Sequence, residues 1–135
     1  MEYRKKKNIA KKLIRGSVVI NIGNQVFADV VAKVQEMLNA FYLKTVEWKP
    51  NNPHTAIRIQ ETTSLHPMIV TDMPMCSEPS RAIIVSSDMD PLSSMNVVEW
   101  KKNFEETAKV LGEGFDQNEL HVAYIDIDVT TYEKA

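Results

Sequence analysis

The hydrophobic pattern of this chain changes its period in a fixed order, and that order limits the fold more than any other feature. The short β-branched run at residues 17–22 predicts a buried strand. Apolar residues then recur at helical spacing over residues 25–42, which predicts a helix with one apolar face. Residues 55–62 alternate between apolar and polar side chains and predict a second strand. The first half of the chain is therefore a β-α-β unit.

The same order recurs in the second half. Residues 81–86 predict a strand, and a helix follows that Ser93 or Ser94 can cap. Gly112 and Gly114 end this helix. Residues 120–130 predict a long strand whose apolar phase switches at Tyr124, which is typical of a central strand or a β-bulge. A loop near residues 63–80 joins the halves.

Two consecutive β-α-β units predict an α/β (α+β) domain over residues 17–135. Each half should hold its strands parallel through a right-handed crossover, giving a four-stranded mixed sheet with both helices on one face. Val, Ile and Ala pack the strands on both sides, so the uncovered face predicts a self-associating chain.

Charge is distributed unevenly along the 135 residues. Residues 1–16 hold seven basic side chains and one acidic side chain, although the whole chain has a net charge of −2. We interpret this basic N-terminal extension as a solvated lead-in, with a polyanion site as the alternative. One cysteine and no apolar run of about 18 residues favour a cytoplasmic protein without a membrane span.

Soft metal donors gather in the loop between the halves. His66, Met68, Met73, Met75 and Cys76 lie within eleven residues, and thioethers and thiols suit Cu(I). Their spacing matches no metal motif, and methionines beside prolines commonly fill a loop against a core. We therefore expect neither a metal nor a cofactor.

Three stretches are similar to motifs of one known family. Residues 52–59 are similar to a Lys-Pro-x-x-Tyr-Ile-x-Val motif, and residues 76–79 with 82–87 are similar to a Gly-Ser-x-Glu-Pro segment leading into a strand. Residues 115–126 resemble the loop and strand that follow the second helix. On these stretches the chain resembles the tautomerase superfamily around macrophage migration inhibitory factor and D-dopachrome tautomerase.

That resemblance implies a homotrimer with pockets between subunits and a small aromatic or keto-acid ligand. It implies keto-enol tautomerase activity (an isomerase of the phenylpyruvate or dopachrome type) that depends on an amino-terminal proline and a lysine. It also implies a cytokine-like role, with secretion outside the usual pathway.

The chain departs from the family at the pocket positions. Gly16 or Ser17 stands at the proline, Asn52 at the lysine, and His121 and Ala123 at a tyrosine and an asparagine. Losing a general base and its electrostatic partner removes most of the rate enhancement. We therefore expect a binding or regulatory protein with tautomerisation near the buffer background.

Two alternatives remain open. An imidazole titrates near neutral pH, so His121 could replace the missing base as a catalytic residue, oriented by Glu119 or Asp126. A third interpretation is a phage-type structural assembly protein of a tail or neck, since such proteins can share this element order and close into rings.

Overall fold

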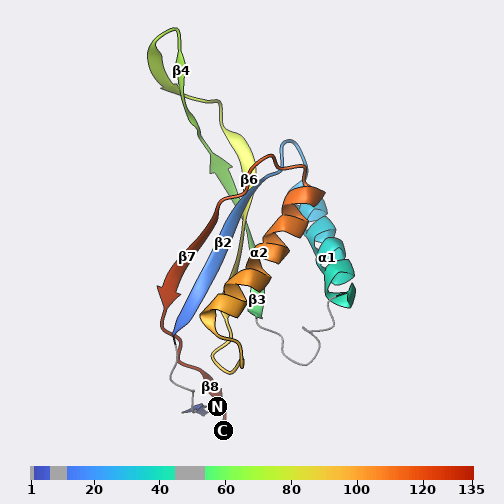
Figure 1. Cartoon of the computed structure of the whole chain (residues 1–135), viewed down its shortest axis with the longest axis vertical. Coiled ribbons are helices and arrows are strands. Elements are labelled where there is room, and N and C mark those ends of the chain that lie inside the picture. The colour runs from blue at the N-terminus through green and yellow to red at the C-terminus, as the bar shows by residue number, and fades with distance from the viewer. Residues whose placement is uncertain (1, 7–11, 45–53) are drawn as a thin grey trace.

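The computed structural model describes residues 2–6, 12–44 and 54–135, and of residues 54 and 55 it describes the backbone alone. In chain order the elements are β1 (Tyr3–Lys5), β2 (Leu13–Asn21), α1 (Phe27–Lys44), β3 (His54–Ser64), β4 (Pro67–Val70), β5 (Met73–Cys76), β6 (Ser80–Met89), α2 (Val97–Gly114), β7 (Val122–Ile127) and β8 (Tyr132–Lys134). Both helices lie on one side of the main sheet (Figure 1). The predicted α+β architecture, with two β-α-β units and a four-stranded sheet, is confirmed.

The strand pairing of the main sheet differs from the prediction. Its order is β3-β6-β2-β7, and every neighbouring pair is antiparallel. The two strands of each half do run in the same direction, but a strand from the other half lies between them. The predicted mixed sheet is therefore wrong. The antiparallel connection from β3 into β6 fills the position beside β3, so the crossover through α1 spans an intervening strand.

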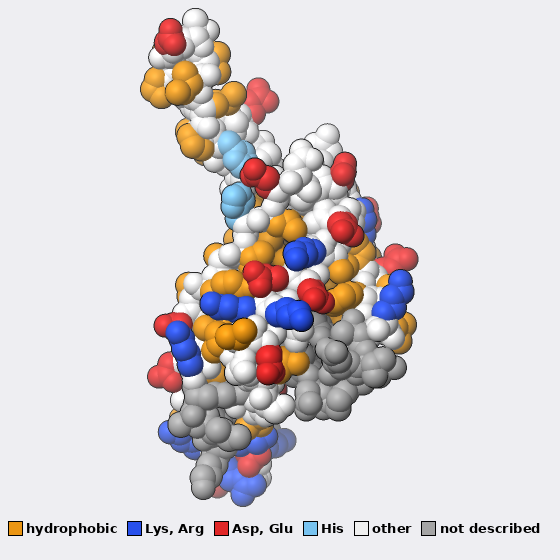
Figure 2. Space-filling model, viewed as in Figure 1, with side chains coloured by type: hydrophobic (Ala, Val, Ile, Leu, Met, Phe, Trp, Pro, Cys, Tyr) orange, Lys and Arg blue, Asp and Glu red, His pale blue; other side chains and the backbone are white. Residues whose placement is uncertain are grey.

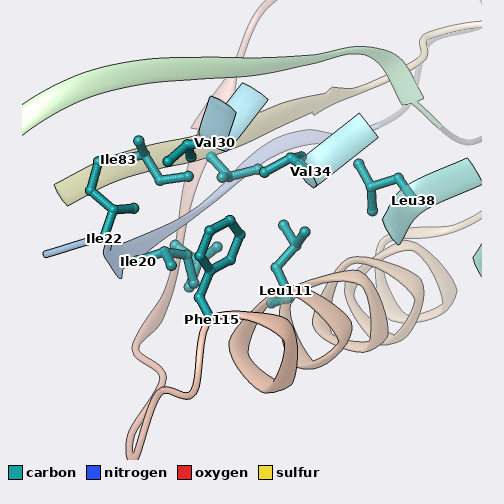
Figure 3. Packing of buried hydrophobic residues seen from close by; sticks show 11 residues of the cluster. Ile20, Ile22, Val30, Val34, Leu38, Ile83, Leu111 and Phe115 are labelled. Atoms are coloured by element: carbon teal, nitrogen blue, oxygen red, sulfur yellow. The ribbon is translucent and has the colours of Figure 1, made fainter. Parts of the chain in front are cut away.

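The main core lies between the sheet and the helices. Alternate residues of β2 and β6 point toward the helices and meet the apolar faces of α1 and α2 (Figure 3). The labelled members of this cluster are Ile20, Ile22, Val30, Val34, Leu38, Ile83, Leu111 and Phe115. The alternation of β2 and the helical spacing of α1 and α2 thus bury one continuous apolar layer.

A second cluster explains a glycine in β2. The rings of Trp100 and Phe104 stack with centroids 5.3 Å apart, and both are buried. A Cβ added at Gly16 would lie 2.7 Å from Cδ1 of Phe104. Gly16 is therefore a packing position under the Phe104 ring on the helix face of the sheet.

The N-terminus of α2 is capped by a residue that the sequence pattern did not single out. The Asn96 side-chain oxygen accepts a hydrogen bond of 2.9 Å from the backbone N–H of Glu99. Ser93 instead accepts a bond from the Met95 N–H, two residues before the helix, so the predicted serine cap is wrong. The helix does end at Gly114, as its glycines predict.

The switch of apolar phase near Tyr124 reflects neither a central strand nor a bulge in β7. β7 is an edge strand, and its register with β2 runs without a shift from Leu13↔Ile127 to Val18↔Val122. Val122 and Tyr124 pack against the cores, whereas Ile125 lies on the other face and is 56% exposed. The register irregularity lies in β3, between His54 and Ile57.

Residues predicted as a loop form a projecting hairpin. β4 and β5 pair antiparallel, with Met68 opposite Met75, and they extend away from the body (Figure 1). Thr71 and Asp72 form its turn with φ angles of 50° and 63°, the left-handed values that two-residue hairpin turns require. The expectation that the methionines fill the core is wrong, because Met68, Met73 and Met75 are exposed.

Two described parts of the predicted N-terminal extension, residues 3–5 and 13–16, lie in strands. β1 pairs with β8 in a small ribbon, where Arg4 Nε lies 3.1 Å from Glu133 Oε1. β2 begins at Leu13, and both Leu13 and Ile14 are buried, so the folded unit starts before residue 17. The polyanion site stays a prediction. Neither helix in the described part of the chain is long and apolar enough to cross a membrane.

Candidate functional site

The helices leave one face of the main sheet uncovered. We call it the open sheet face and define it by the alternate residues that point away from the helices: Ser17, Val19, Ala82, Ile84, Ser86, Ala123 and Ile125. Val19 is 45% exposed there. These seven side chains are small or apolar, and Ala82 and Ser86 are buried among their neighbours. Gln60 and Thr62 of β3, opposite Ile84 and Ala82, add polar side chains to the same face. Within the described residues no helix packs over it.

Three charged side chains lie at one end of the open sheet face. Asp88 accepts hydrogen bonds from Arg15 Nε at 2.6 Å and from Arg58 Nη2 at 2.9 Å. The bond from Arg15 is the main cause that holds the pKa of Asp88 below its ordinary value, and it raises the pKa of Arg15. Two guanidinium groups around one carboxylate leave a net positive charge, and we call this group the Asp88 triad.

A cleft of about 620 Å³ lies where the loop between α2 and β7 meets the end of β2 and the base of the hairpin. Its lining comes from three separate parts of the chain: Val19 and Asn21; Ser64 and His66; and Asp116, Gln117, Asn118, Glu119 and His121. The fold brings these parts together at one end of the sheet.

Gln117 fixes the α2–β7 loop against β2. Its Oε1 accepts a hydrogen bond of 3.0 Å from the Asn21 N–H, and its Nε2 donates a bond of 2.9 Å to the Asn21 carbonyl. The same Nε2 also donates to the Phe115 carbonyl at 2.9 Å. The Gln117 side-chain amide thus pairs with the Asn21 backbone as a neighbouring strand would. It holds the nearby Asp116 and Glu119 at the cleft.

The cleft carries acidic but no basic lysine or arginine side chains among its lining residues. Asp116 and Glu119 supply two carboxylates, and His121 Nε2 lies 3.3 Å from Glu119 Oε2. A concave surface lined by one sign of charge attracts ligands of the opposite sign. The geometry therefore favours a small ligand that is cationic and rich in hydrogen-bonding groups.

The structure places the predicted site residues apart. His121 lines the cleft, but Gly16 faces the helices under Phe104. Ser17 and Ala123 are opposite each other on the open sheet face, outside the cleft lining. Asn52 lies outside the described residues.

Sequence reasoning did not single out residues 116–118. The signal was present, because residues 116–119 form a run of four polar residues directly after Phe115, the C-cap of α2. Their approach to Asn21 and His66 depends on the tertiary fold. Within the described ranges, no three His, Cys, Asp or Glu side chains are grouped so that they could hold a metal ion.

The fold is a ferredoxin-like α+β arrangement, defined by the antiparallel order β3-β6-β2-β7 with α1 and α2 on one face. The sequence matches no family model and no curated protein. The comparison with known proteins therefore depends on structure.

Solved structures of this fold class include two of a phage S-adenosylmethionine (SAM) lyase. The apo enzyme matches with a TM-score of 0.57 and 9% identity, over 96% of this chain and 95% of that chain. The complex with S-methyl-5'-thioadenosine matches with a TM-score of 0.53 and 12% identity, over the same shares. The Bacillus subtilis GlnK–ATP complex matches with a TM-score of 0.45 and 10% identity, over 87% and 84%, too low to support an argument.

These neighbours overturn the resemblance to the tautomerase superfamily. Similar structures come from SAM lyases rather than tautomerases, and the observed sheet is antiparallel rather than mixed. The motifs behind the resemblance were short, and a short strand motif does not determine which strands pair. The pocket and ligand that the resemblance implied lose that support.

Proposed function

We propose that this chain binds S-adenosylmethionine in the cleft between the hairpin base and the α2–β7 loop. The observation that carries the proposal is the acidic lining, in which Asp116 and Glu119 face a cleft without lysine or arginine side chains. SAM bears a permanent sulfonium charge and an ammonium group against one carboxylate, so its net charge is positive. The attraction between opposite charges supports binding.

Size and hydrogen bonding support the same ligand. The volume of about 620 Å³ lies within the range of roughly 300–1,000 Å³ that is usual for small-molecule sites. The Asn118 amide and the two carboxylates offer donors and acceptors of the kind that ribose hydroxyls and an adenine ring require. The same carboxylates disfavour nucleotides with phosphates and the keto acids expected from the sequence.

The fold adds independent support for an adenosyl ligand. Two similar structures are of a SAM lyase, and one of them holds S-methyl-5'-thioadenosine. At identities of 9% and 12% the likeness concerns the fold, so the ligand rests on the charge and shape of the cleft.

Calorimetry with three ligands tests the proposal. S-adenosylhomocysteine lacks the sulfonium methyl group and its charge, so it is a matched control for SAM, and ATP is an anionic control. We expect SAM to bind at least about tenfold more tightly than S-adenosylhomocysteine, a difference of about 1.4 kcal/mol, and ATP not to bind. Equal affinity for SAM and S-adenosylhomocysteine would contradict the charge argument.

Substitution of a cleft carboxylate gives a second test. Glu119→Gln removes a charge at the cleft and should weaken SAM binding about tenfold, with little effect on S-adenosylhomocysteine. Glu113→Gln is the control, because Glu113 lies near the end of α2 outside the cleft lining. Equal losses in both variants would show that overall charge, rather than the cleft, attracts SAM.

The Glu119–His121 pair supports cleavage of SAM as a second candidate function. A base at His121 can take a proton from the β-carbon of the methionine moiety. The C–H electrons then form a double bond between the β- and γ-carbons, and the electrons of the γ-carbon–sulfur bond pass to sulfur. S-methyl-5'-thioadenosine leaves, and an unsaturated four-carbon amino acid remains.

Chromatography of a SAM incubation detects this reaction. We expect S-methyl-5'-thioadenosine to form, and His121→Gln to lower kcat by about 10²–10⁴-fold with KM nearly unchanged. Binding of SAM without any release of S-methyl-5'-thioadenosine would leave a binding protein and reject the lyase. Turnover that survives in His121→Gln would reject His121 as the base.

A further inference from the structure

The projecting hairpin exposes apolar side chains along its whole length. Eight of the ten residues at 67–76 are apolar: Pro67, Met68, Ile69, Val70, Met73, Pro74, Met75 and Cys76. All residues of β4 and β5 are exposed, and Ile69 is 77% exposed. Figure 2 shows apolar side chains gathered on this projection. A contiguous exposed apolar surface of this kind marks an interaction site.

No side chain of β4 or β5 is buried in the described structure. Isolated two-stranded hairpins are marginally stable in water. At its base, the His66 N–H donates to Ser77 Oγ at 2.9 Å and the Ser77 N–H donates to the His66 carbonyl at 2.8 Å. These bonds set the register at the base, but they bury no apolar surface. A partner that covers β4 and β5 would supply the missing burial.

We propose that the β4–β5 hairpin of one copy of this chain packs on the open sheet face of a second copy. The open sheet face is the complementary surface that the chain itself offers, since Val19 and Ile125 are exposed there among small residues. The lengths also match. Asp72 lies six positions after His66, as Asp88 does after Ala82, and each distance is about 20 Å in an extended strand.

Charge complements this apolar match. Asp72 is the single charged residue within residues 67–76, and it lies at the hairpin turn. The Asp88 triad, with its net positive charge, lies at the far end of the open sheet face. A hairpin that enters at the Ala82 end would bring Asp72 toward this triad. No lysine or arginine occurs in residues 59–80, which disfavours an anionic lipid surface as the partner.

Packing of this kind is heterologous, because the hairpin of each copy meets a different surface on the next. Such contacts close into a ring when the rotation between copies divides a full turn. The contact is consistent with the self-association that the apolar strands predict. Val19 belongs to both the open sheet face and the cleft lining, so a hairpin seated there would border the cleft. The tests of the contact use Ile69 and Ile125, which lie outside the cleft lining, so either proposal can fail alone.

Sedimentation velocity on the full chain tests the hairpin directly. We expect the wild type to self-associate and Ile69→Asp to dissociate it to monomer. Val98→Asp is the matched control, because Val98 on α2 is also 77% exposed but lies away from the proposed contact. A wild type that stays monomeric at high micromolar concentration would overturn the proposal, as would equal association of both variants.

A mixing experiment tests the pairing of hairpin with face. Ile125→Asp changes the open sheet face and leaves the hairpin intact, whereas Ile69→Asp does the reverse. Each variant alone should be monomeric, and their mixture should form a one-to-one dimer through the single intact contact. Failure to form the mixed dimer would reject hairpin-to-face packing. Monomers that bind neutral phospholipid vesicles through the hairpin would assign it to a lipid surface instead.

Cross-linking locates the contact. Cys76 is the chain's single cysteine and is exposed in β5, so a benzophenone maleimide attached there lies on the hairpin. In a mixture of light and ¹⁵N-labelled chains, we expect light-to-heavy cross-links to peptides of β2, β6 or β7. Cross-links to the helices, or only within one chain, would contradict the proposal.

Discussion

Gly16 was predicted to lie in a ligand pocket, but in the structure it is a packing position. The overturned resemblance put Gly16 at the position of the tautomerase proline, whereas in the structure Phe104 occupies the space above it. Gly16→Ala would force the Phe104 ring to move, and overpacking of this kind costs about 1–3 kcal/mol. Urea denaturation should show this loss of unfolding free energy.

Ser17→Ala is the control for that measurement. Ser17 is the next residue on β2 and points to the open sheet face, opposite Ala123. Its substitution should change the unfolding free energy by less than about 0.5 kcal/mol. Equal losses at both positions would show that the strand, rather than contact with Phe104, determines the cost.

Asp88 gives a pH-dependent prediction. Hydrogen bonds from Arg15 and Arg58 hold its pKa below the ordinary value of 3.8. A lowered folded-state pKa stabilises the fold above 3.8, and this contribution is lost as the pH falls through the lower, folded-state value. Asp88→Asn should lower the unfolding free energy by about 1 kcal/mol, since the arginines are partly solvated.

Urea titrations at several pH values check this. The difference between wild type and Asp88→Asn should be constant above about pH 5 and shrink below about pH 4. Glu133→Gln is the control, because its ion pair with Arg4 is exposed and should contribute less than about 0.5 kcal/mol. A difference that grows on acidification would contradict the assigned direction of the pKa shift.

At the scale of single elements, the start of α2 depends on one side chain. Asn96 accepts the Glu99 N–H at 2.9 Å, and replacing such a cap with alanine typically costs about 1 kcal/mol. Asn96→Ala should therefore lower the unfolding free energy in urea by that amount, and Ser94→Ala should have almost no effect. The opposite result would restore the serine cap that the sequence pattern favoured.

The helices and strands of the sheet could be predicted because their periods are local properties of the chain. The apolar spacing of α1 and α2 and the alternation in β3 place these elements to within a few residues. Strand pairing could not be predicted, because it depends on which distant surfaces bury each other. The β4–β5 hairpin was missed because prolines are depleted in strands, and its Thr71–Asp72 turn lacks the usual glycine.

The candidate site was predictable only in part for the same reason. His121 could be named from its chemistry and its place near a strand. Asp116 and Gln117 become informative only when Gln117 is seen to hold the loop against Asn21. The hairpin base reaches the cleft through the tertiary fold, so no spacing in the sequence reveals the position of His66 there.

At the scale of the whole molecule, two truncations locate the start of the folded unit. Removing residues 1–12 deletes β1, whose residues are exposed, and should change the unfolding free energy by about 1 kcal/mol or less. Removing residues 1–15 also deletes Leu13 and Ile14, which are buried, and should cost well over about 3 kcal/mol. Thermal melts of both truncations check this. Equal melting temperatures would place the start of the unit at residue 17, as the sequence predicted.

The interleaved order of the sheet governs how the protein can form during synthesis. When the ribosome has released residues 1–64, β2 and β3 are complete, but each lacks its neighbours, because β6 and β7 are still to be made. The strands of one half are not neighbours in the sheet and cannot pair with each other. The apolar side of α1 therefore stays unburied until the second half of the chain is made. Folding is therefore a late, cooperative event, and a nascent chain that stalls before β6 would expose its future core to chaperones and proteases.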